Sequence, residues 1–199
     1  MHKKIDSSKQ RLLTSGAALI SEKGYAGVSV REICKHAETS INMIHHFFGS
    51  KEGLLVAIIE SYGENVFLLP MKLLEFEPQT KVDFVSRIAL VFETTLDAFI
   101  ANREILMITI REQKSPKLLL EYMQALKQFI DNAKEQGFTR ENLDTEMLTG
   151  FMLDRLINQV QFAPWIRDKF VTDVLHDKAY LKRWSQSNID IFLHGILSP

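Results

Sequence analysis

The sequence has few of the residues that mark secreted, membrane-spanning or disulfide-bonded proteins. Cysteine occurs once in 199 residues, at Cys34, so no intrachain disulfide can form. The chain has no apolar run of about 18 residues, the length that indicates a transmembrane helix. Its first residues lack the apolar core of a signal peptide. We therefore expect a cytoplasmic protein with no membrane partner, in which Cys34 is a small core side chain.

Signatures of catalysis and of metal binding are also missing. The chain contains no glycine-rich phosphate loop, no G-x-S-x-G and no H-E-x-x-H. His45 and His46 are adjacent, but adjacent residues of a helix point about 100° apart and cannot easily hold one ion. Cys34 and His36 do not have the spacing of zinc ligands. We therefore predict no enzymatic activity, no cofactor and no metal site.

The charges are nearly balanced over the whole chain but not along it. The formal net charge is −1, whereas the first 55 residues carry eight basic and five acidic side chains. A modest positive charge gathered at one end favours a protein that binds nucleic acid with its N-terminal part. This signal is weak by itself, because such a segment often arises by chance.

Apolar residues recur at helical spacing along most of the chain, prolines are few, and no stretch alternates like a strand. This pattern predicts an all-α fold. Residues 165–177 are expected to form a loop with a short helical turn, and Ser7 is expected to cap the first helix. The predicted helices cover residues 8–23, 30–36, 41–47, 51–74, 81–101, 103–113, 117–136, 145–163 and 178–197.

Residues 28–55 have the pattern of a helix-turn-helix. Ser29 and Glu32 form a capping box at the start of a short helix. Residues 37–40 allow only a tight turn before a second short helix, which Gly49 ends and after which Ser50 caps the next helix. Two short helices joined in this way suit a motif that lays its second helix in the DNA major groove.

This segment resembles the N-terminal DNA-binding domain of TetR-family transcriptional regulators over about residues 8–60. The resemblance is carried by VSVREI at 28–33, AETS at 37–40 and HFFGSKEGLL at 46–55. It implies a bacterial, cytoplasmic protein with a DNA-binding domain over 1–52 and a helical ligand-binding and dimerisation domain over 53–199. The helix at about 51–74 would link the two. The chain departs from the family's usual residues at Asn42, Met43, His45 and Gly49, which affects the operator sequence rather than the fold.

The expected DNA contacts fall into two groups. Asn can bond adenine with two hydrogen bonds, and an apolar side chain can contact a thymine methyl, so the second short helix supplies candidates for base recognition. A helix N-terminus and basic side chains suit the phosphates. For Ser29, Thr39 and Ser50, capping alone is an equally good interpretation. The base candidates are Ser40, Ile41, Asn42, His45 and His46, and the phosphate candidates are Ser29, Arg31, Thr39, His46 and Lys51.

The last two long helices, at 145–163 and 178–197, are apolar on more than one face, and Trp184 is among these apolar side chains. A helix of this kind needs two partners, so we expect a homodimer through both helices, packed as a two-fold four-helix bundle. The alternative is deep burial of both helices within one subunit.

Helices rich in Phe and Met should converge in the C-terminal part. Core packing is the simpler interpretation for each of these residues, but together they can line an apolar pocket, which the family resemblance also implies. The candidates are Phe67, Met71, Phe92, Met107, Tyr122, Met123, Phe151 and Gln159.

Together with these patterns, the resemblance to TetR-family regulators implies a homodimeric repressor of a palindromic double-stranded operator, relieved by a small hydrophobic effector. Two alternatives stay open. One is a DNA-binding protein of the same fold that is regulated by a protein partner. The other is a helical ligand-binding protein or enzyme that does not bind DNA.

Overall fold

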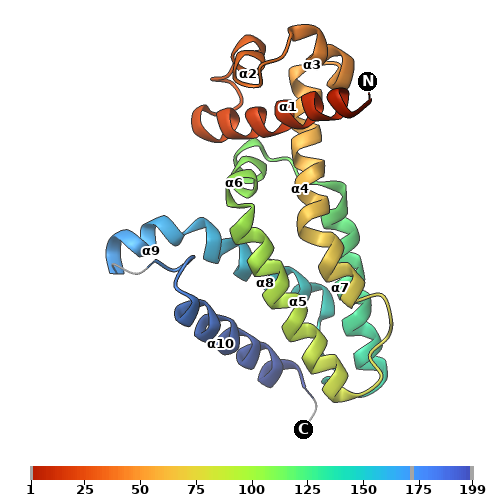
Figure 1. Cartoon of the computed structure of the whole chain (residues 1–199). Coiled ribbons are helices and arrows are strands. Elements are labelled where there is room, and N and C mark those ends of the chain that lie inside the picture. The colour runs from red at the N-terminus through yellow and green to blue at the C-terminus, as the bar shows by residue number, and fades with distance from the viewer. Residues whose placement is uncertain (1, 171–172, 198–199) are drawn as a thin grey trace. The chain divides into compact units, whose positions relative to one another are not determined.

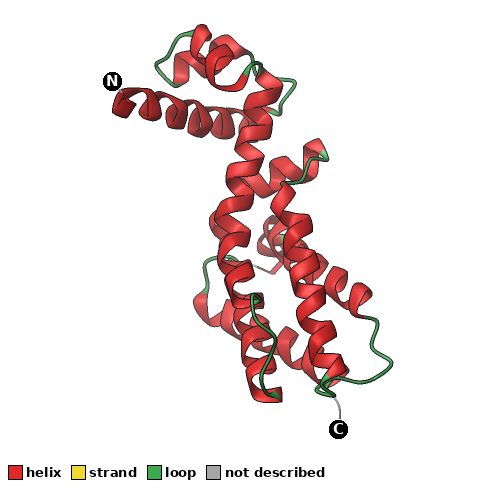
Figure 2. Cartoon of the chain, turned by 90° about the vertical axis from the view of Figure 1, so that its right-hand side faces the viewer, coloured by secondary structure: helices red, strands yellow, loops and turns green. Residues whose placement is uncertain are grey.

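The computed structural model describes residues 2–170 and 173–197, and these residues form ten helices (Figure 1). Helices alone make up its regular structure there, apart from one isolated bridge between Thr139 and Leu197 (Figure 2). The helices are α1 (His2–Lys23), α2 (Val30–His36), α3 (Ile41–Phe48), α4 (Lys51–Leu73), α5 (Lys81–Ala101), α6 (Arg103–Glu112), α7 (Lys117–Glu135), α8 (Thr145–Gln161), α9 (Ala163–Phe170) and α10 (Lys178–Ile196).

Most helices lie where the apolar spacing predicts them, and two predictions are wrong. The first helix begins at His2, so Ser7 lies inside it and is not its N-cap. The loop expected from residue 165 begins instead as α9. Pro164 suits the first turn of a helix, where no amide partner is lost. Trp165 of this helix is largely exposed.

The chain divides into two compact units. The first contains the residues up to Glu64 together with Asn102–Lys117, and the second contains Asn65–Ala101 together with the residues from Leu118 onward. Helix α4 contributes residues to both. The assignment of 1–52 to DNA binding and of 53–199 to ligand binding and dimerisation stays a prediction, because compactness does not measure function.

The core of the first unit joins the three N-terminal helices to α4 and α6. Apolar side chains from all five helices pack there, and Leu12, Ile33, Ile44, Leu54 and Ile108 are among the fully buried ones. Cys34 is buried in the same core, as expected, and burial raises the pKa of its thiol. Each helix of the N-terminal domain is therefore fixed by burial of one apolar face.

The second unit is built around aromatic side chains. The ring centroids of Phe67 and Tyr122 lie 5.0 Å apart, and those of Phe92 and Trp184 lie 5.8 Å apart. Trp184 is buried against Phe92 within its own subunit, so it is not available to face a partner as the sequence pattern suggests.

Arg87 of α5 holds the loop between α4 and α5. Its guanidinium donates to the carbonyls of Leu73 at 2.7 Å, Phe76 at 2.6 Å and Glu77 at 3.3 Å. The same group lies 4.4 Å from the ring centroid of Phe129. One planar side chain therefore satisfies three backbone carbonyls that helix α4 and its loop leave open.

Helix α4 is long and apolar enough, by length and composition alone, to cross a membrane, although no continuous apolar run stands out in the sequence. Half of its most apolar window is buried inside the protein. That burial is typical of the core helix of a globular protein, and Pro70 lies inside the helix without ending it.

Candidate DNA-binding site

The helix-turn-helix is organised by local caps. The hydroxyl of Ser29 accepts from the amide of Glu32 at 3.2 Å, and the Glu32 carboxylate accepts from the amide of Ser29 at 2.8 Å. The capping box is therefore confirmed. Gly49 ends α3 with a φ of 73°, which a side chain would disfavour, and the hydroxyl of Ser50 accepts from the amide of Gly53 at 3.0 Å.

Helix α3 presents one face outward. Ile44 is fully buried, whereas Asn42, His45 and His46 are exposed and Ile41 is 39% exposed. Ser40 occupies the N-cap position, and its side chain makes no capping hydrogen bond. Ser40 and these four exposed residues are the five candidates for base contacts, and the structure brings them together on the first two turns of one short helix.

His45 has a defined tautomer. Its Nδ1 lies 3.0 Å from the carbonyl oxygen of Gly49, which can only accept a hydrogen bond. Nδ1 therefore carries a proton, which leaves Nε2 of the exposed ring free to meet a ligand. The His46 ring lies against Phe47, with centroids 5.0 Å apart.

Helix α1 fixes the turn of the motif from behind. The Nε of Arg11 donates to the carbonyl of Ala37, the C-cap of α2, at 2.9 Å. Nδ1 of His36 lies 3.0 Å from the hydroxyl of Ser15. These two contacts orient the end of α2, and hence the start of the turn that leads to α3.

The phosphate candidates have different surroundings. Arg31 is exposed on α2, and the hydroxyl of Ser29 is engaged in its cap. The hydroxyl of Thr39 is buried and lies beside the thiol of Cys34, so it faces inward. The ammonium of Lys51 donates to the carbonyl of Tyr25 and lies 4.2 Å from the centroid of the Tyr25 ring. Contacts to DNA by these residues stay predictions.

A polar network around Tyr25 is absent from the sequence-based expectations. The amide of Tyr25 donates to Glu112 of α6 at 3.4 Å, and its hydroxyl bonds the carboxylate of Glu52. Glu52 also pairs with Lys114 at 2.7 Å. The hydrogen bonds from Lys114 and then Tyr25 lower the pKa of Glu52, whereas burial and then the bond to Glu52 raise the pKa of Tyr25.

Helix α6 is attached to the end of α1 by a neighbouring side chain. The guanidinium of Arg111 donates to the carbonyls of Ile20 at 2.5 Å and Ser21 at 3.4 Å. These carbonyls belong to the last turn of α1, where the Ile20 carbonyl also accepts from the amide of Gly24 at 2.9 Å, so Arg111 adds a side-chain donor to this helix end. No local pattern reveals such contacts, because Arg111 lies 90 residues from Ser21 in the sequence.

Comparison with known proteins identifies the N-terminal domain. A family model described as bacterial regulatory proteins, tetR family, matches residues 12–58, which include α2, the turn and α3. Residues 12–58 are therefore a DNA-binding domain of the TetR type. The chain is a DNA-binding transcriptional regulator, and α3 is the second helix of its helix-turn-helix.

Similarity to known regulators extends beyond this domain. It is 23% identical to the probable HTH-type transcriptional regulator YttP of Bacillus subtilis over 85% of this chain and 83% of that protein. It is 27% identical to the HTH-type transcriptional repressor NemR of Escherichia coli over 46% of this chain and 45% of NemR.

Among solved structures, the fold is similar to that of FadR from Bacillus subtilis in complex with stearoyl-CoA. The TM-score is 0.73 at 16% identity, over 94% of this chain and 98% of that one. At this identity the likeness establishes the fold alone, including the all-helical C-terminal part, and not a shared ligand.

The residues expected to line an effector site do not form one group. Phe67 and Tyr122 are buried in contact with each other, and the Tyr122 hydroxyl lies 3.2 Å from that of Thr95. Phe92 belongs to the cluster around Trp184, and buried Gln159 donates to the carbonyl of Val174 at 3.4 Å. Met71 and Met123 are half-buried. Met107 lies in α6 of the first unit, apart from the aromatic residues of the second unit. The last candidate is Phe151.

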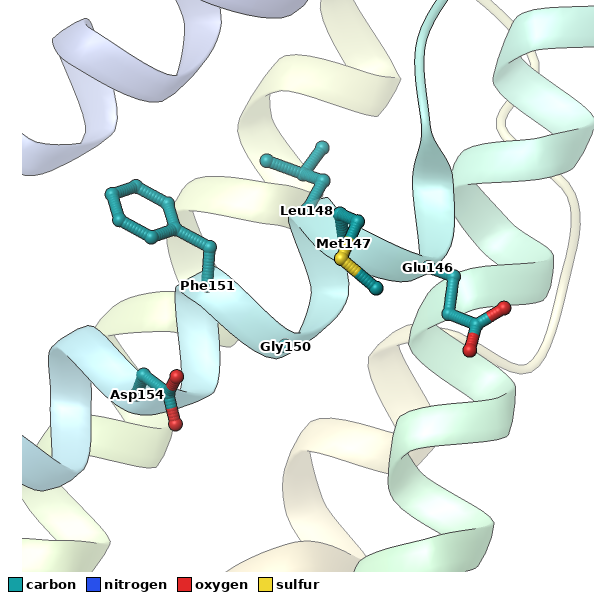
Figure 3. A pocket seen from close by; sticks show the side chains of 6 residues that line it. All are labelled: Glu146, Met147, Leu148, Gly150, Phe151 and Asp154. Carbon is teal, nitrogen blue, oxygen red and sulfur yellow. The ribbon is translucent and has the colours of Figure 1, made fainter.

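Phe151 lies on the outer face of α8. Figure 3 shows its ring beside an open hollow that is lined from this one helix by Glu146, Met147, Leu148, Gly150, Phe151 and Asp154. Met147 is 65% exposed and Phe151 is 55% exposed. On α10, Ile191 is 68% exposed, and the ring of Phe192 touches that of Phe151 with centroids 5.5 Å apart. The two helices therefore carry exposed apolar side chains, as the two-faced pattern predicts.

Across residues 2–170 and 173–197, no three His, Cys, Asp or Glu side chains come close enough to hold a metal ion.

Proposed function

We propose that the protein is a homodimeric repressor that binds a palindromic operator and is released from it by a small apolar effector. The observation that carries this proposal is the outward face of α3, where Asn42, His45 and His46 are exposed and opposite Ile44 in the core. A short helix held so firmly, with polar side chains on its free face, suits reading of base edges.

A palindromic operator requires two copies of this helix related by a two-fold axis. The exposed apolar side chains Met147, Phe151 and Ile191 support α8 and α10 as the interface. Gly150 lies between Met147 and Phe151 in the sequence of α8, and a Cβ placed there would meet no atom within 4 Å. The glycine thus leaves room for a helix of a second copy to approach closely.

The effector is proposed to be apolar because aromatic rings dominate the second unit. The Thr95 and Tyr122 hydroxyls, bonded to each other among Phe67 and Phe99, offer one polar point in that apolar interior. The similar structure of FadR in complex with stearoyl-CoA supports a long-chain acyl group as the first compound class to test.

The effector can act only by binding the state that does not bind DNA more tightly than the state that does. Coupling is then reciprocal, so operator DNA must weaken effector binding by the same factor, typically about 5- to 150-fold. Helix α4 is the proposed link, because it starts directly after the helix-turn-helix and continues into the second unit.

The test starts from the bacterial genome that encodes the protein. Genomic fragments that co-purify with the protein are sequenced, and the shared motif is titrated with and without long-chain acyl thioesters. We expect a two-fold symmetric motif and weaker DNA binding when the effector is present. An effector that tightens DNA binding would contradict the repressor model, and a motif without symmetry would contradict the dimer.

We also expect a cytoplasmic protein without catalytic turnover, as in transcriptional regulators. If no compound changes DNA affinity while a protein partner does, the alternative of a partner-regulated protein is correct. If a compound is turned over and no specific DNA binding is detected, the protein is an enzyme on this fold.

A further inference from the structure

Tyr25, in the loop between α1 and α2, uses every polar group it has. Its carbonyl and its ring hold the ammonium of Lys51, its amide donates to Glu112, and its hydroxyl bonds Glu52. These partners come from the start of α4 and the end of α6. Tyr25 is half-buried, and it joins the end of α6 to the start of α4 beside the direct Lys114–Glu52 ion pair.

We propose that Tyr25, held in place by α6, is a positioning residue that orders Lys51 for contact with the DNA backbone. This inference rests on the proposed DNA-binding role of Lys51. It adds a residue outside the helix-turn-helix helices and a route by which α6 changes DNA affinity.

The physical basis is the flexibility of lysine. A free lysine side chain samples many rotamers, and ordering it on binding costs roughly 0.5–1.5 kcal/mol. The carbonyl and ring of Tyr25 fix the Lys51 ammonium before DNA arrives. An ammonium has three donors, so the Tyr25 carbonyl leaves others for a phosphate oxygen. Lys51 is also the first residue of α4, where helix amides favour an anion.

The acidic groups beside Lys51 are already engaged. Glu52 pairs with Lys114 at 2.7 Å and with the Tyr25 hydroxyl, and Glu112 accepts from Arg111 at 3.2 Å and from the Tyr25 amide. Neither carboxylate bonds the Lys51 ammonium. The positive charge of Lys51 is therefore held by an uncharged carbonyl and a ring face, which do not cancel its attraction for phosphate.

Contacts made by the end of α6 and the residues after it hold Tyr25 in this position. Arg111 is bonded to the last turn of α1, Lys114 to Glu52, and the amide of Lys117 donates to Glu60 at 3.3 Å. These anchors lie along residues 111–117 and bind α1 and α4 on both sides of Tyr25. A displacement of this segment would remove the partners of Tyr25 and release Lys51 from its position.

The experiment is a double-mutant cycle on a random-sequence duplex of about 25 base pairs at low salt, because phosphate contacts act on all DNA. We expect Tyr25→Leu to weaken binding about 2- to 10-fold, the range that corresponds to the ordering cost above. In a Lys51→Ala background, Tyr25→Leu should have no further effect. Both variants keep the backbone carbonyl, but Tyr25→Phe also keeps the ring over the Lys51 ammonium and should weaken binding less than Tyr25→Leu.

Two further variants separate positioning from folding. Lys114→Gln removes an anchor of Glu52 without touching Tyr25 and should weaken DNA binding only when Lys51 is present. Lys72→Ala, at the far end of α4, is the matched lysine control and should leave DNA affinity unchanged. Circular dichroism melting reports whether each variant is folded. If Tyr25→Leu is unfolded, the effect of Lys114→Gln on DNA binding tests the positioning role instead.

The outcomes are distinguishable. If Lys51→Ala binds the duplex as tightly as the unmodified protein, the phosphate role of Lys51 in the proposed function is wrong. If Lys51→Ala weakens binding but Tyr25→Leu and Lys114→Gln are equally harmful with and without Lys51, Tyr25 acts on the fold and the positioning role is overturned.

Discussion

Replacement of Phe151 by aspartate tests the proposed interface at its most exposed ring. The side chain is 55% exposed in the single subunit. A phenylalanine buries roughly 200 Å² in a protein interior, so about 100 Å² remains to be covered by a partner. At about 25 cal/mol per Å², this contact stabilises the dimer by about 2.5 kcal/mol per copy. Two-fold symmetry doubles the effect to about 5 kcal/mol, which is more than a 1,000-fold change in the dimer dissociation constant.

Sedimentation velocity over a dilution series measures that constant. Phe151→Asp should sediment as a monomer at concentrations where the unmodified protein is a dimer, and Ile191→Asp should do the same. Leu120→Asp is the matched control, because Leu120 is 62% exposed on α7 and lies outside α8 and α10. If both variants stay dimeric, or if Leu120→Asp is equally disruptive, the interface has been assigned to the wrong surface. Trp184 is not used for this test, because its ring packs inside its own subunit between Phe92 and Arg155.

Three other outcomes follow from single side chains. Arg87→Lys should lower the free energy of unfolding by about 1–3 kcal/mol in urea titrations, because an ammonium cannot bond three carbonyls with a planar fork; an unchanged midpoint would remove Arg87 as the anchor of its loop. Ile44→Ala should lower the free energy of unfolding by about 2–5 kcal/mol. Ile41→Ala, on the exposed face, should leave stability unchanged and weaken operator binding. If Ile41→Ala destabilised the protein and Ile44→Ala did not, α3 would face the other way. Burial raises the pKa of Tyr122 from 10.0 to about 12, so the folded state favours the protonated phenol. The stability that comes from the protonated phenol is fully present below pH 10 and is lost as the pH rises through about 12. The free energy of unfolding should therefore fall over that pH range, and it should fall less steeply in Tyr122→Phe. The same pH profile in the unmodified protein and in Tyr122→Phe would contradict this.

Local features of the fold could be predicted from sequence because their determinants are adjacent. The capping box joins Ser29 and Glu32, and Gly49 supplies its own left-handed turn, so a few residues suffice to locate α2 and the end of α3. Helix α9 was not predictable in the same way. It has eight residues, Pro164 in its first turn and no polar residue directly before it, so its apolar residues form only a short stripe without a cap.

The surroundings of the site depend on contacts between distant residues. The first residue of α4 is a natural place for a phosphate-binding lysine, and the sequence alone leaves the Lys51 side chain free. In the structure, the Lys51 side chain is held by Tyr25, which lies 26 residues before it in the sequence. Tyr25 in turn bonds Glu112, which lies 87 residues after Tyr25. Such pairs carry no local signature, so only the folded chain reveals that α6 reaches the DNA-binding domain.

The central claim is that two copies of α3 read a symmetric operator, and the most direct measurement is a base-by-base affinity profile of the isolated motif for the unmodified protein and for Asn42→Ala. The account predicts two half-sites related by a two-fold axis, with Asn42→Ala costing about 1–3 kcal/mol and relaxing preference at the same base position in each half. If Asn42→Ala weakens specific and random DNA equally, or changes one half-site only, α3 does not read the operator as proposed.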